Sequence, residues 1–482
     1  MSEIPFDNSY TTLPEHFYRR VEPAKVTGPQ LVRFNRELGA ELGLKLDSVS
    51  ESALAGWFSG NVLPDGADPI AQAYAGHQFG GWVPQLGDGR AILLGEVIGS
   101  DGVRKDIQLK GAGRTPFSRG GDGKSPLGPA VREYLMSEAM AGLGVPTTRA
   151  LALVSTEDSV FREEALQGGV FTRVASSHLR VGTFQYFLGQ QDTDGLRVLA
   201  DYAIARHYPE CAESETPHRC FLGKVVAAQA SLIAHWMTLG FIHGVMNTDN
   251  MTISGETIDY GPCAFMDTFD PAKTFSSIDR GGRYAWGNQA AIGHWNLTRL
   301  AETMLALFDE GREKAIPIAE EILGTYEEAF KAAYFGRFRK KLGLTASHAE
   351  SGDFIEDTLS LIADEEADFT LFFRHLTKVA KGESEEKWLG LLSDPPAGAG
   401  WLEKWRAFGE PDAALMAAEN PVLIPRNHRV EEAILAAYKG DFSLFNRLTE
   451  AWRNPFAESS QNDDLEAPPG PGEVVEATFC GT

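Results

Sequence analysis

The chain has 482 residues, a formal net charge of -23, and hydrophobic residues at 43% of its positions. A single hydrophobic core stops growing near ~250–300 residues, so the length predicts two lobes. A chain this acidic repels nucleic acid and anionic membranes except where its cations cluster, so we expect neither as a partner.

The N-terminus has no apolar run of signal-peptide length, and no stretch reaches the ~18 apolar residues typical of a transmembrane span. The cysteines lack the CxxC spacing that is typical of a structural zinc site. Together these features predict a cytoplasmic protein.

The first part of the chain predicts a small, mixed α+β lobe over residues 1–174, with an N-terminal extension that includes a helix at 29–44. Apolar runs on either side of "GSDG" predict a β-hairpin over 90–111, and a second strand pair is expected around "EDSVFREEALQ". Between them, apolar residues at helical spacing predict a helix in "GPAVREYLMSEAMAGLGVP".

The second part predicts a larger, mainly α-helical lobe over residues 175–455, because four long segments carry helical periodicity. From 456 to 482 the chain is acidic and rich in Pro and Gly, which predicts a flexible tail.

A basic, glycine-rich segment, "KGAGRTPFSRGGDGKSP", has the composition of a phosphate-binding loop. It is not a Walker A motif, because the position that requires the first glycine is Ser118. The GxG sequences at 87–89 and 111–113 lack the third glycine of a dinucleotide fingerprint.

The order of motifs favours a protein-kinase-like bilobal fold. The Gly-rich turn with Gly87 and Gly89 precedes Lys110 at the end of a strand, and Glu133 follows on the helix. A lysine ammonium binds phosphate oxygens, and a glutamate partner fixes its position.

The segment "HGVMNTDNMTISGETIDYG" resembles a kinase catalytic loop followed by a metal-binding hairpin. Asn250 and Asp259 match the two residues that hold Mg²⁺ in kinases. The kinase base is missing, because its position is Val245, and Asp249 is the loop carboxylate able to accept a hydroxyl proton.

Arg173 and Arg180 follow the second predicted strand pair at the junction of the lobes, where they suit phosphate binding. At this point two functions stay open: a kinase-like phosphotransferase and a non-catalytic nucleotide-binding scaffold. The missing kinase base argues against the first, and the retained lysine, glutamate and metal ligands argue against the second.

Taken together, "AYAGHQFGGWVPQLGDGRA", "QLKGAGRTPFSRGGDGK", "REYLMSEAM", "TRVASSHLRVGTF", "HGVMNTDNM" and "DYGPCAFMD" resemble the selenoprotein O family of kinase-like protein adenylyltransferases. These stretches span about residues 70–270. The terminal "CGT" also resembles the family, whose eukaryotic members carry selenocysteine where this chain has Cys480, so it resembles a cysteine-containing bacterial member.

The resemblance implies transfer of AMP from ATP to Ser, Thr or Tyr hydroxyls of proteins, with release of pyrophosphate and with ATP flipped relative to kinases. It implies Asp249 as the base, Asn250 and Asp259 as ligands of Mg²⁺ or Mn²⁺, and Glu133 as the partner of the lysine. The nucleotide site implied by the resemblance consists of Gly87, Gly89, Arg90, Lys110, Asp122, Gly123, Arg173 and Arg180.

The family also suggests a disulfide between Cys263, just after the "DYG" motif, and Cys480, which would tether the tail over the site. The alternative is two unpaired thiols. The sequence leaves open the acceptor proteins, the choice between ATP and UTP, and the oligomeric state.

Overall fold

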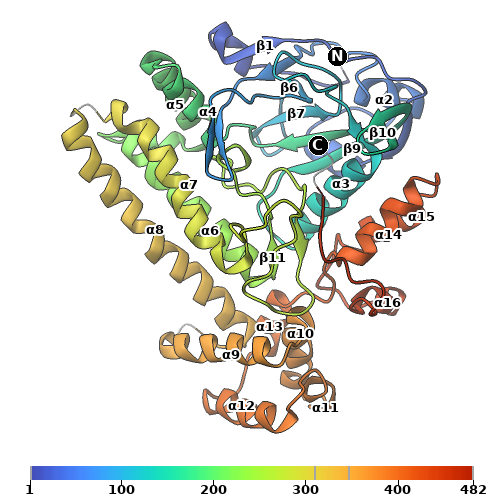
Figure 1. Ribbon diagram of the computed structural model, residues 1–482, viewed down its shortest axis with the longest axis vertical. Coiled ribbons are helices and arrows are strands. Elements are labelled where there is room, and N and C mark those ends of the chain that lie inside the picture. Colours follow the sequence, from blue (N-terminus) through green and yellow to red (C-terminus); the bar gives the residue numbers. More distant parts are fainter. Residues whose placement is uncertain (1–2, 309–310, 346–347, 480–482) are drawn as a thin grey trace.

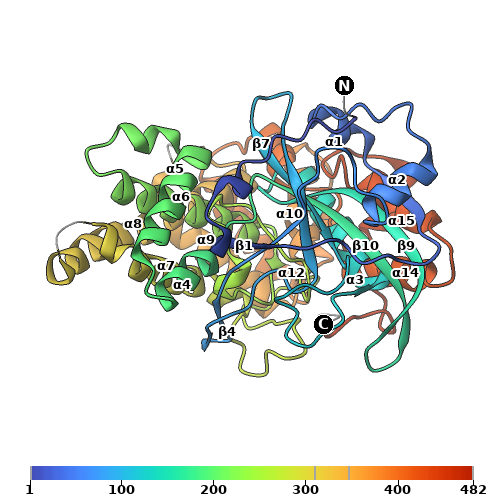
Figure 2. The ribbon, with the colours of Figure 1, turned by 90° about the horizontal axis from the view of Figure 1, so that it is seen from above.

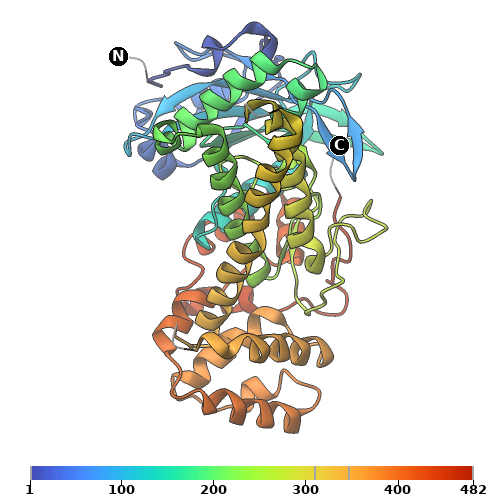
Figure 3. The same ribbon diagram turned by 90° about the vertical axis from the view of Figure 1, so that its left-hand side faces the viewer.

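The computed structural model describes residues 3–308, 311–345 and 348–479, and it has two lobes stacked along its long axis (Figures 1 and 3). One lobe is built on a β-sheet, and the other is mainly helical. This arrangement confirms the predicted α+β class with a β-rich N-lobe and a helical C-lobe.

The main sheet is antiparallel and has the strand order β1-β3-β6-β7-β10-β9-β2, with β8 paired to β10. Its central strands form the two predicted hairpins. The bounds are β1 Tyr18–Arg20, β2 Gln30–Phe34, β3 Ile70–Gln72, β6 Ala91–Ile98, β7 Arg104–Lys110, β8 Ser125–Pro126, β9 Arg149–Phe161 and β10 Ala165–Ala175.

Alternate residues of these strands point to opposite faces, and each face has its own hydrophobic core. Ile92 and Leu94 pack with α1 (Arg36–Glu41) and α2 (Glu51–Phe58) on one face, while Leu93 packs on the other with α3 (Leu127–Gly142). The apolar residues of α3 therefore fix its height against the sheet, and with it the position of Glu133.

The C-lobe is built around α6 (Pro217–Thr238), which packs against α7 (Gln289–Met304) and α8 (Arg312–Lys341). By length and composition α6 could cross a membrane, but 67% of its most apolar window is buried inside the fold. Beside it lie α4 (Val181–Gly189) and α5 (Thr193–His207) (Figure 1).

A group of helices lies at the end of the molecule farthest from the sheet (Figure 3). These are α9 Gly352–Asp364, α10 Phe369–Ala380, α11 Glu386–Leu389, α12 Pro395–Ala407 and α13 Ala413–Glu419. The chain then returns to the N-lobe, where α14 (Asn427–Ala437) and α15 (Ser443–Ala451) pack on α3. Two helices that the prediction assigns to the C-lobe, α14 and α15, therefore support helix α3 of the N-lobe.

Two local features differ from the sequence prediction. The predicted helix at 29–44 is strand β2 followed by the short helix α1, because Leu31 and Phe34 pair with the neighbouring strand β9. The expected strands after the catalytic loop are isolated bridges at Thr252 and Thr257.

The tail also has contacts that the prediction did not include. It contains the short helix α16 (Asp463–Glu466), and Thr478 pairs with Ser276 in a parallel bridge. The Oγ1 of Thr478 donates a hydrogen bond to the Pro262 carbonyl at 2.7 Å. The end of the described chain thus lies along the segment that follows the "DYG" motif.

Candidate functional site

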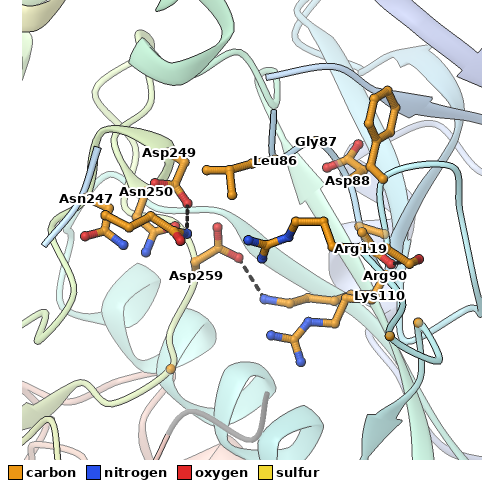
Figure 4. Close-up of a pocket in the computed structure, with 18 of the residues that line it drawn as sticks. Leu86, Gly87, Asp88, Arg90, Lys110, Arg119, Asn247, Asp249, Asn250 and Asp259 are labelled. Carbon is orange, nitrogen blue, oxygen red and sulfur yellow. Dashed lines mark hydrogen bonds and ion pairs between the residues drawn. The ribbon is translucent and has the colours of Figure 1, made fainter. Parts of the chain in front are cut away.

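A cavity of about 850 Å³ lies between the sheet and the helical lobe (Figure 4). Its walls come from segments that are far apart in the sequence: the Gly-rich turn at 87–90, the basic loop at 117–124, the catalytic loop at 245–250, and Asp259. Apart from Glu133, which lies behind the wall, all the predicted nucleotide, metal and base residues line this cavity.

Lys110 lies at the centre of the site. Its Nζ is 2.7 Å from Glu133 and 2.7 Å from Asp259. Lys110 is the last residue of β7, and Glu133 is a buried residue of α3, so the predicted kinase-like pair is present. The second contact, to Asp259, draws the metal-ligand candidate into the same cluster.

Two buried arginines complete the cluster. Arg173 contacts Asp259 at 2.7 Å and Glu133 at 3.2 Å, and Arg180 contacts Asp259 at 2.6 Å. Burial alone would raise the pKa of Asp259, but these three cations hold it well below its ordinary value. Three cations thus gather around one carboxylate, and their N–H groups suit the oxygens of a phosphate.

Asp259 adopts a left-handed backbone conformation, with φ of 62°. This region is uncommon for residues other than glycine, although aspartate tolerates it better than most. The tertiary contacts of its carboxylate with Lys110, Arg173 and Arg180 accompany this conformation, which is typical of a functional position.

Asp249 lies beside Asp259 and across the cavity from the Gly-rich turn, in the short 3₁₀ helix Thr248–Asn250 (Figure 4). Its Oδ2 accepts a hydrogen bond from Gln78 at 3.1 Å, and its Oδ1 has no hydrogen-bond partner within the described residues. Burial raises its pKa to about 6, against the lowering effect of Gln78 and Arg180. A carboxylate with this pKa is ionised at neutral pH and accepts a proton more readily than an ordinary aspartate.

Asn250 donates its side-chain amide to the Val245 carbonyl at 3.0 Å. The amide oxygen is then the atom that remains for a metal ion. Within the described residues no group of three or more His, Cys, Asp and Glu side chains has a metal-binding arrangement. Asp259 and the Asn250 amide oxygen are hard-oxygen donors of the kind that Mg²⁺ takes.

The Gly-rich turn needs glycine for steric reasons. Gly87 has φ of 71°, and a Cβ there would lie 2.3 Å from the Phe117 ring. A Cβ at Gly89 would lie 3.1 Å from the Phe117 carbonyl oxygen. The turn therefore packs directly on the basic loop, which forms the outer wall of the cavity, and Arg90 lines the cavity beside it.

The basic loop presents fewer cations to the cavity than its composition suggests. Lys124 pairs with Asp158 at 2.8 Å, and Arg114 donates to carbonyls of its own loop. Asp122 pairs with Arg162 at 3.0 Å, so it holds a neighbouring arginine at the rim. Arg119 lines the cavity and has no carboxylate partner within the described residues.

Gly123 closes this loop, because its carbonyl accepts a hydrogen bond from the Gly113 amide. The φ of Gly123 is 69°, and a Cβ there would lie 2.0 Å from the Gly113 carbonyl oxygen. A side chain at this position would open the loop, so Gly123 is a shaping residue as well as a wall of the cavity.

The predicted cysteine pair is only partly described. Cys263 is buried, and Cys480 lies outside the described residues, so their pairing stays a hypothesis. Cys211 and Cys220 form a disulfide between the 3₁₀ helix Pro209–Glu213 and α6. Their nine-residue separation did not reveal this bond, which depends on the close approach of two helices.

Several residues of the site were not found from the sequence. Gln78 bonds Asp249, and Gln108 bonds both Arg173 and Asp88 at 2.7 and 3.2 Å. Asp88 is 1% exposed, and burial raises its pKa to about 6. The position of Asp88 between the two glycines of the turn could have indicated that it belongs to the site. Nothing in the sequence around Gln78 or Gln108 indicates their roles.

Comparison with known proteins agrees with this geometry. Residues 1–453 match the family model described as "Protein adenylyltransferase SelO". The chain is 53% identical to the "Protein nucleotidyltransferase YdiU" of Rhizobium meliloti (strain 1021), over 100% of both chains. It is 54% identical to the protein of the same description from Rhodopseudomonas palustris (strain BisB5), over 99% of both chains.

Proposed function

This chain belongs to the SelO family of protein adenylyltransferases, and we propose that it moves AMP from ATP to hydroxyl groups of proteins and releases pyrophosphate. The relatives named above are described as protein nucleotidyltransferases, which leaves the base of the nucleotide open. The observation that carries the proposal is the cationic cluster at Asp259 beside the buried carboxylate Asp249, because Arg180 Nη1 donates both to Asp259 Oδ2 and to the Asp249 carbonyl, each at 2.6 Å.

The cations determine where the triphosphate lies. Lys110, Arg173 and Arg180 gather around Asp259 in the cavity wall, so phosphate oxygens bind there with charge-assisted hydrogen bonds. At the outer wall, Arg119 provides a further cation. Cations both at the Asp259 cluster and at the outer wall support a flipped ATP, with its β- and γ-phosphates bound and its α-phosphate toward the acceptor.

In the reaction, the acceptor oxygen forms a bond to the α-phosphorus, and the bond from that phosphorus to the α,β-bridging oxygen breaks. Asp249 takes the hydroxyl proton, and pyrophosphate leaves with the electron pair. The cationic cluster stabilises the negative charge that develops on the leaving group. Glu133 keeps Lys110 in place through this step, because its carboxylate is buried against the lysine.

A divalent cation fits the donors at the site. The amide oxygen of Asn250 and the carboxylate of Asp259 would hold it together with phosphate oxygens, and bound there it would neutralise phosphate charge. In the free protein the Asp259 carboxylate is occupied by three cations, so ATP and the metal would enter together as the cations turn to phosphate.

Two labelled nucleotides test the proposal. The protein is incubated with Mg²⁺ and ATP labelled at either the α- or the γ-phosphate, and protein-bound label is measured. We expect label from the α-position only, with pyrophosphate released in equal amount. Label from the γ-position would instead assign kinase chemistry, and bound ATP without any transfer would assign a scaffold.

Two further arms refine the result. α-Labelled UTP in place of ATP decides between AMP and UMP as the transferred group. The variant Asp259→Ala should abolish α-label transfer, because it loses a metal ligand and the counter-ion of the cluster. Undiminished labelling in that variant would contradict the role given to Asp259.

A further inference from the structure

A small hairpin of the N-lobe lies directly on the catalytic loop. It consists of β4 (Gly76–Gln78) and β5 (Gly81–Val83), and it projects away from the main sheet (Figure 2). Three consecutive residues of the hairpin donate hydrogen bonds to three consecutive residues of the loop. These are His77 N to Thr248 Oγ1 at 2.7 Å, Gln78 Nε2 to Asp249 Oδ2 at 3.1 Å, and Phe79 N to Asn247 Oδ1 at 2.9 Å.

These contacts fix the hairpin on the side of the cavity where Asp249 lies. A Cβ at Gly76 would lie 2.7 Å from Asp249 Oδ1, so the backbone of the hairpin packs against the carboxylate itself. An acceptor hydroxyl that reaches Asp249 therefore brings its neighbouring residues close to the tip of the hairpin, which is formed by Phe79 and Gly80.

The tip presents an apolar side chain in a strained conformation. Phe79 has φ of 50°, which is unfavourable for a bulky residue, and its side chain is 37% exposed. Its ring contacts the Tyr284 ring, with 5.1 Å between centroids. Ile278, which is 62% exposed, lines the same mouth of the cavity. Two exposed apolar side chains at one mouth suit contact with another protein chain.

Arg283 lies just behind the tip. Its guanidinium is 3.6–3.7 Å from the position of a Cβ at Gly80, and it stacks over the Trp295 ring at 4.8 Å. Arg283 has no ion pair to any of residues 3–308, 311–345 or 348–479, whereas Arg299, which also stacks over the Trp295 ring, pairs with Glu302. In a chain with a net charge of -23, a held but unpaired arginine at this place favours an acidic partner.

We propose that the hairpin tip and Arg283 form a docking surface for an extended segment of the acceptor protein that carries an acidic residue near the modified hydroxyl. The inference rests on the proposed function and adds the kind of sequence that is modified. The carboxylate pairs with Arg283, and an apolar side chain beside it packs on Phe79 and Ile278.

The geometry limits how many residues separate the acidic side chain from the modified hydroxyl in the acceptor. Gln78 contacts Asp249, and Gly80, two residues farther along, contacts Arg283. An extended acceptor advances about 3.3 Å per residue, so an acidic side chain within about three residues of the hydroxyl spans the same distance.

Peptide pools test this inference. Degenerate peptides with one central Ser, Thr or Tyr are made in three sets, with Asp, Lys or Ala fixed in turn at each of the four positions on either side. Transfer of α-label from ATP is measured, and the ratio between the Asp and Lys sets is taken within each enzyme preparation. This ratio is independent of the fraction of enzyme that is folded.

The variant Arg283→Glu is compared with wild type and with Arg280→Glu, which makes the same charge change at an exposed position three residues earlier in the same segment. We expect wild type and Arg280→Glu to prefer Asp pools by about threefold to fivefold at one or two positions, the size typical of a rim ion pair. Arg283→Glu should reverse the preference toward Lys pools, a gain that misfolding cannot produce.

Each outcome has a separate meaning. Label transferred from the α-phosphate without a preference between the Asp and Lys pools, or with the same preference in Arg283→Glu, overturns the docking surface and leaves the proposed function standing. Label on the enzyme's own chain alone, with every pool unlabelled, assigns the surface to self-modification and also overturns the inference. Absence of any α-label transfer would reject the proposed function and this inference with it.

Discussion

Asp88 provides a sharp test of the electrostatics in the cavity wall. Its Oδ2 accepts hydrogen bonds from the Gln72 amide at 3.0 Å and from Gln108 at 3.2 Å, while its Oδ1 has no partner within the described residues. In Asp88→Asn the amide oxygen can take the place of Oδ2, and the NH₂ group takes the place of the unpartnered oxygen. The substitution therefore removes a buried charge and keeps the two hydrogen bonds.

The size of the expected change in the free energy of unfolding follows from the pKa of Asp88. Burial raises the pKa of Asp88 from 3.8 to about 6, and this difference corresponds to about 3 kcal/mol. Because the folded pKa lies above the unfolded one, the ionised carboxylate destabilises the fold fully above about pH 6, and the penalty declines as the pH falls toward 3.8. The new NH₂ group is buried without an acceptor and offsets about 1–2 kcal/mol of the gain.

Urea unfolding at pH 8 and pH 5 measures the effect. We expect Asp88→Asn to raise the free energy of unfolding by about 1–2 kcal/mol at pH 8, and the gain to fall by about 1.5 kcal/mol at pH 5, where part of the wild-type Asp88 is protonated. A free-energy difference that is equal at the two pH values would refute the reasoning.

Asp279→Asn is the matched control. Asp279 is also buried, but each of its oxygens accepts one backbone amide, from Arg283 at 2.9 Å and from Tyr284 at 2.7 Å. An asparagine there must place its NH₂ against an N–H donor, so this variant should lose about 1–3 kcal/mol. If both variants were stabilised at pH 8, the hydrogen-bond pattern would not be what decides whether the free energy of unfolding rises or falls.

Three further predictions concern the site and the helical lobe. Asp249→Asn should lower α-label transfer by about 100-fold to 10,000-fold, with ATP binding retained in equilibrium dialysis; a variant with more than a tenth of the wild-type rate would exclude Asp249 as the base. Lys110→Met leaves Glu133 with one cation fewer and should cost about 3 kcal/mol of stability in urea unfolding, together with a weaker affinity for ATP; unchanged affinity would place the phosphates elsewhere. The Cys211 and Cys220 thiols should be found linked in peptides mapped without reductant, and Cys211→Ser should lose about 2.5 kcal/mol under oxidising conditions; two free thiols would argue against the bond.

The central residues of the site could be predicted because their order along the chain is informative. A lysine at a strand end, a glutamate on the next helix and the Asn250–Asp259 hairpin occur in an order that only a kinase-like fold explains well. The structure then brings Lys110, Glu133 and Asp259 together at 2.7 Å. Each of these positions could be read from a local pattern.

The residues that surround this centre could not be predicted, because they depend on contacts between distant segments. Gln78 and Asp249 are separated by 171 positions, and nothing near Gln78 in the sequence indicates its partner. The loop cations were overestimated for the same reason. Composition counts Lys124 as available for phosphate, whereas Asp158, which pairs with it, lies on a different hairpin.

The helix expected at 29–44 shows the limit of periodicity. Apolar residues in "PQLVRFNRELGAELGL" fit helical spacing, but the first half is an edge strand whose partner β9 lies more than a hundred residues away. Short apolar runs of this kind satisfy both patterns, and the free edge of the sheet decides between them.

The position of Thr478 has a practical consequence for anyone who prepares this protein. Since its hydroxyl and backbone are bonded to Pro262 and Phe275, the chain at Thr478 lies beside the segment that leaves Asp259. An affinity tag fused a few residues after this point would itself offer hydroxyl groups to the enzyme at high local concentration. The N-terminus emerges on the far side of the sheet lobe (Figure 3), and a tag at that end keeps labelling experiments free of this artefact.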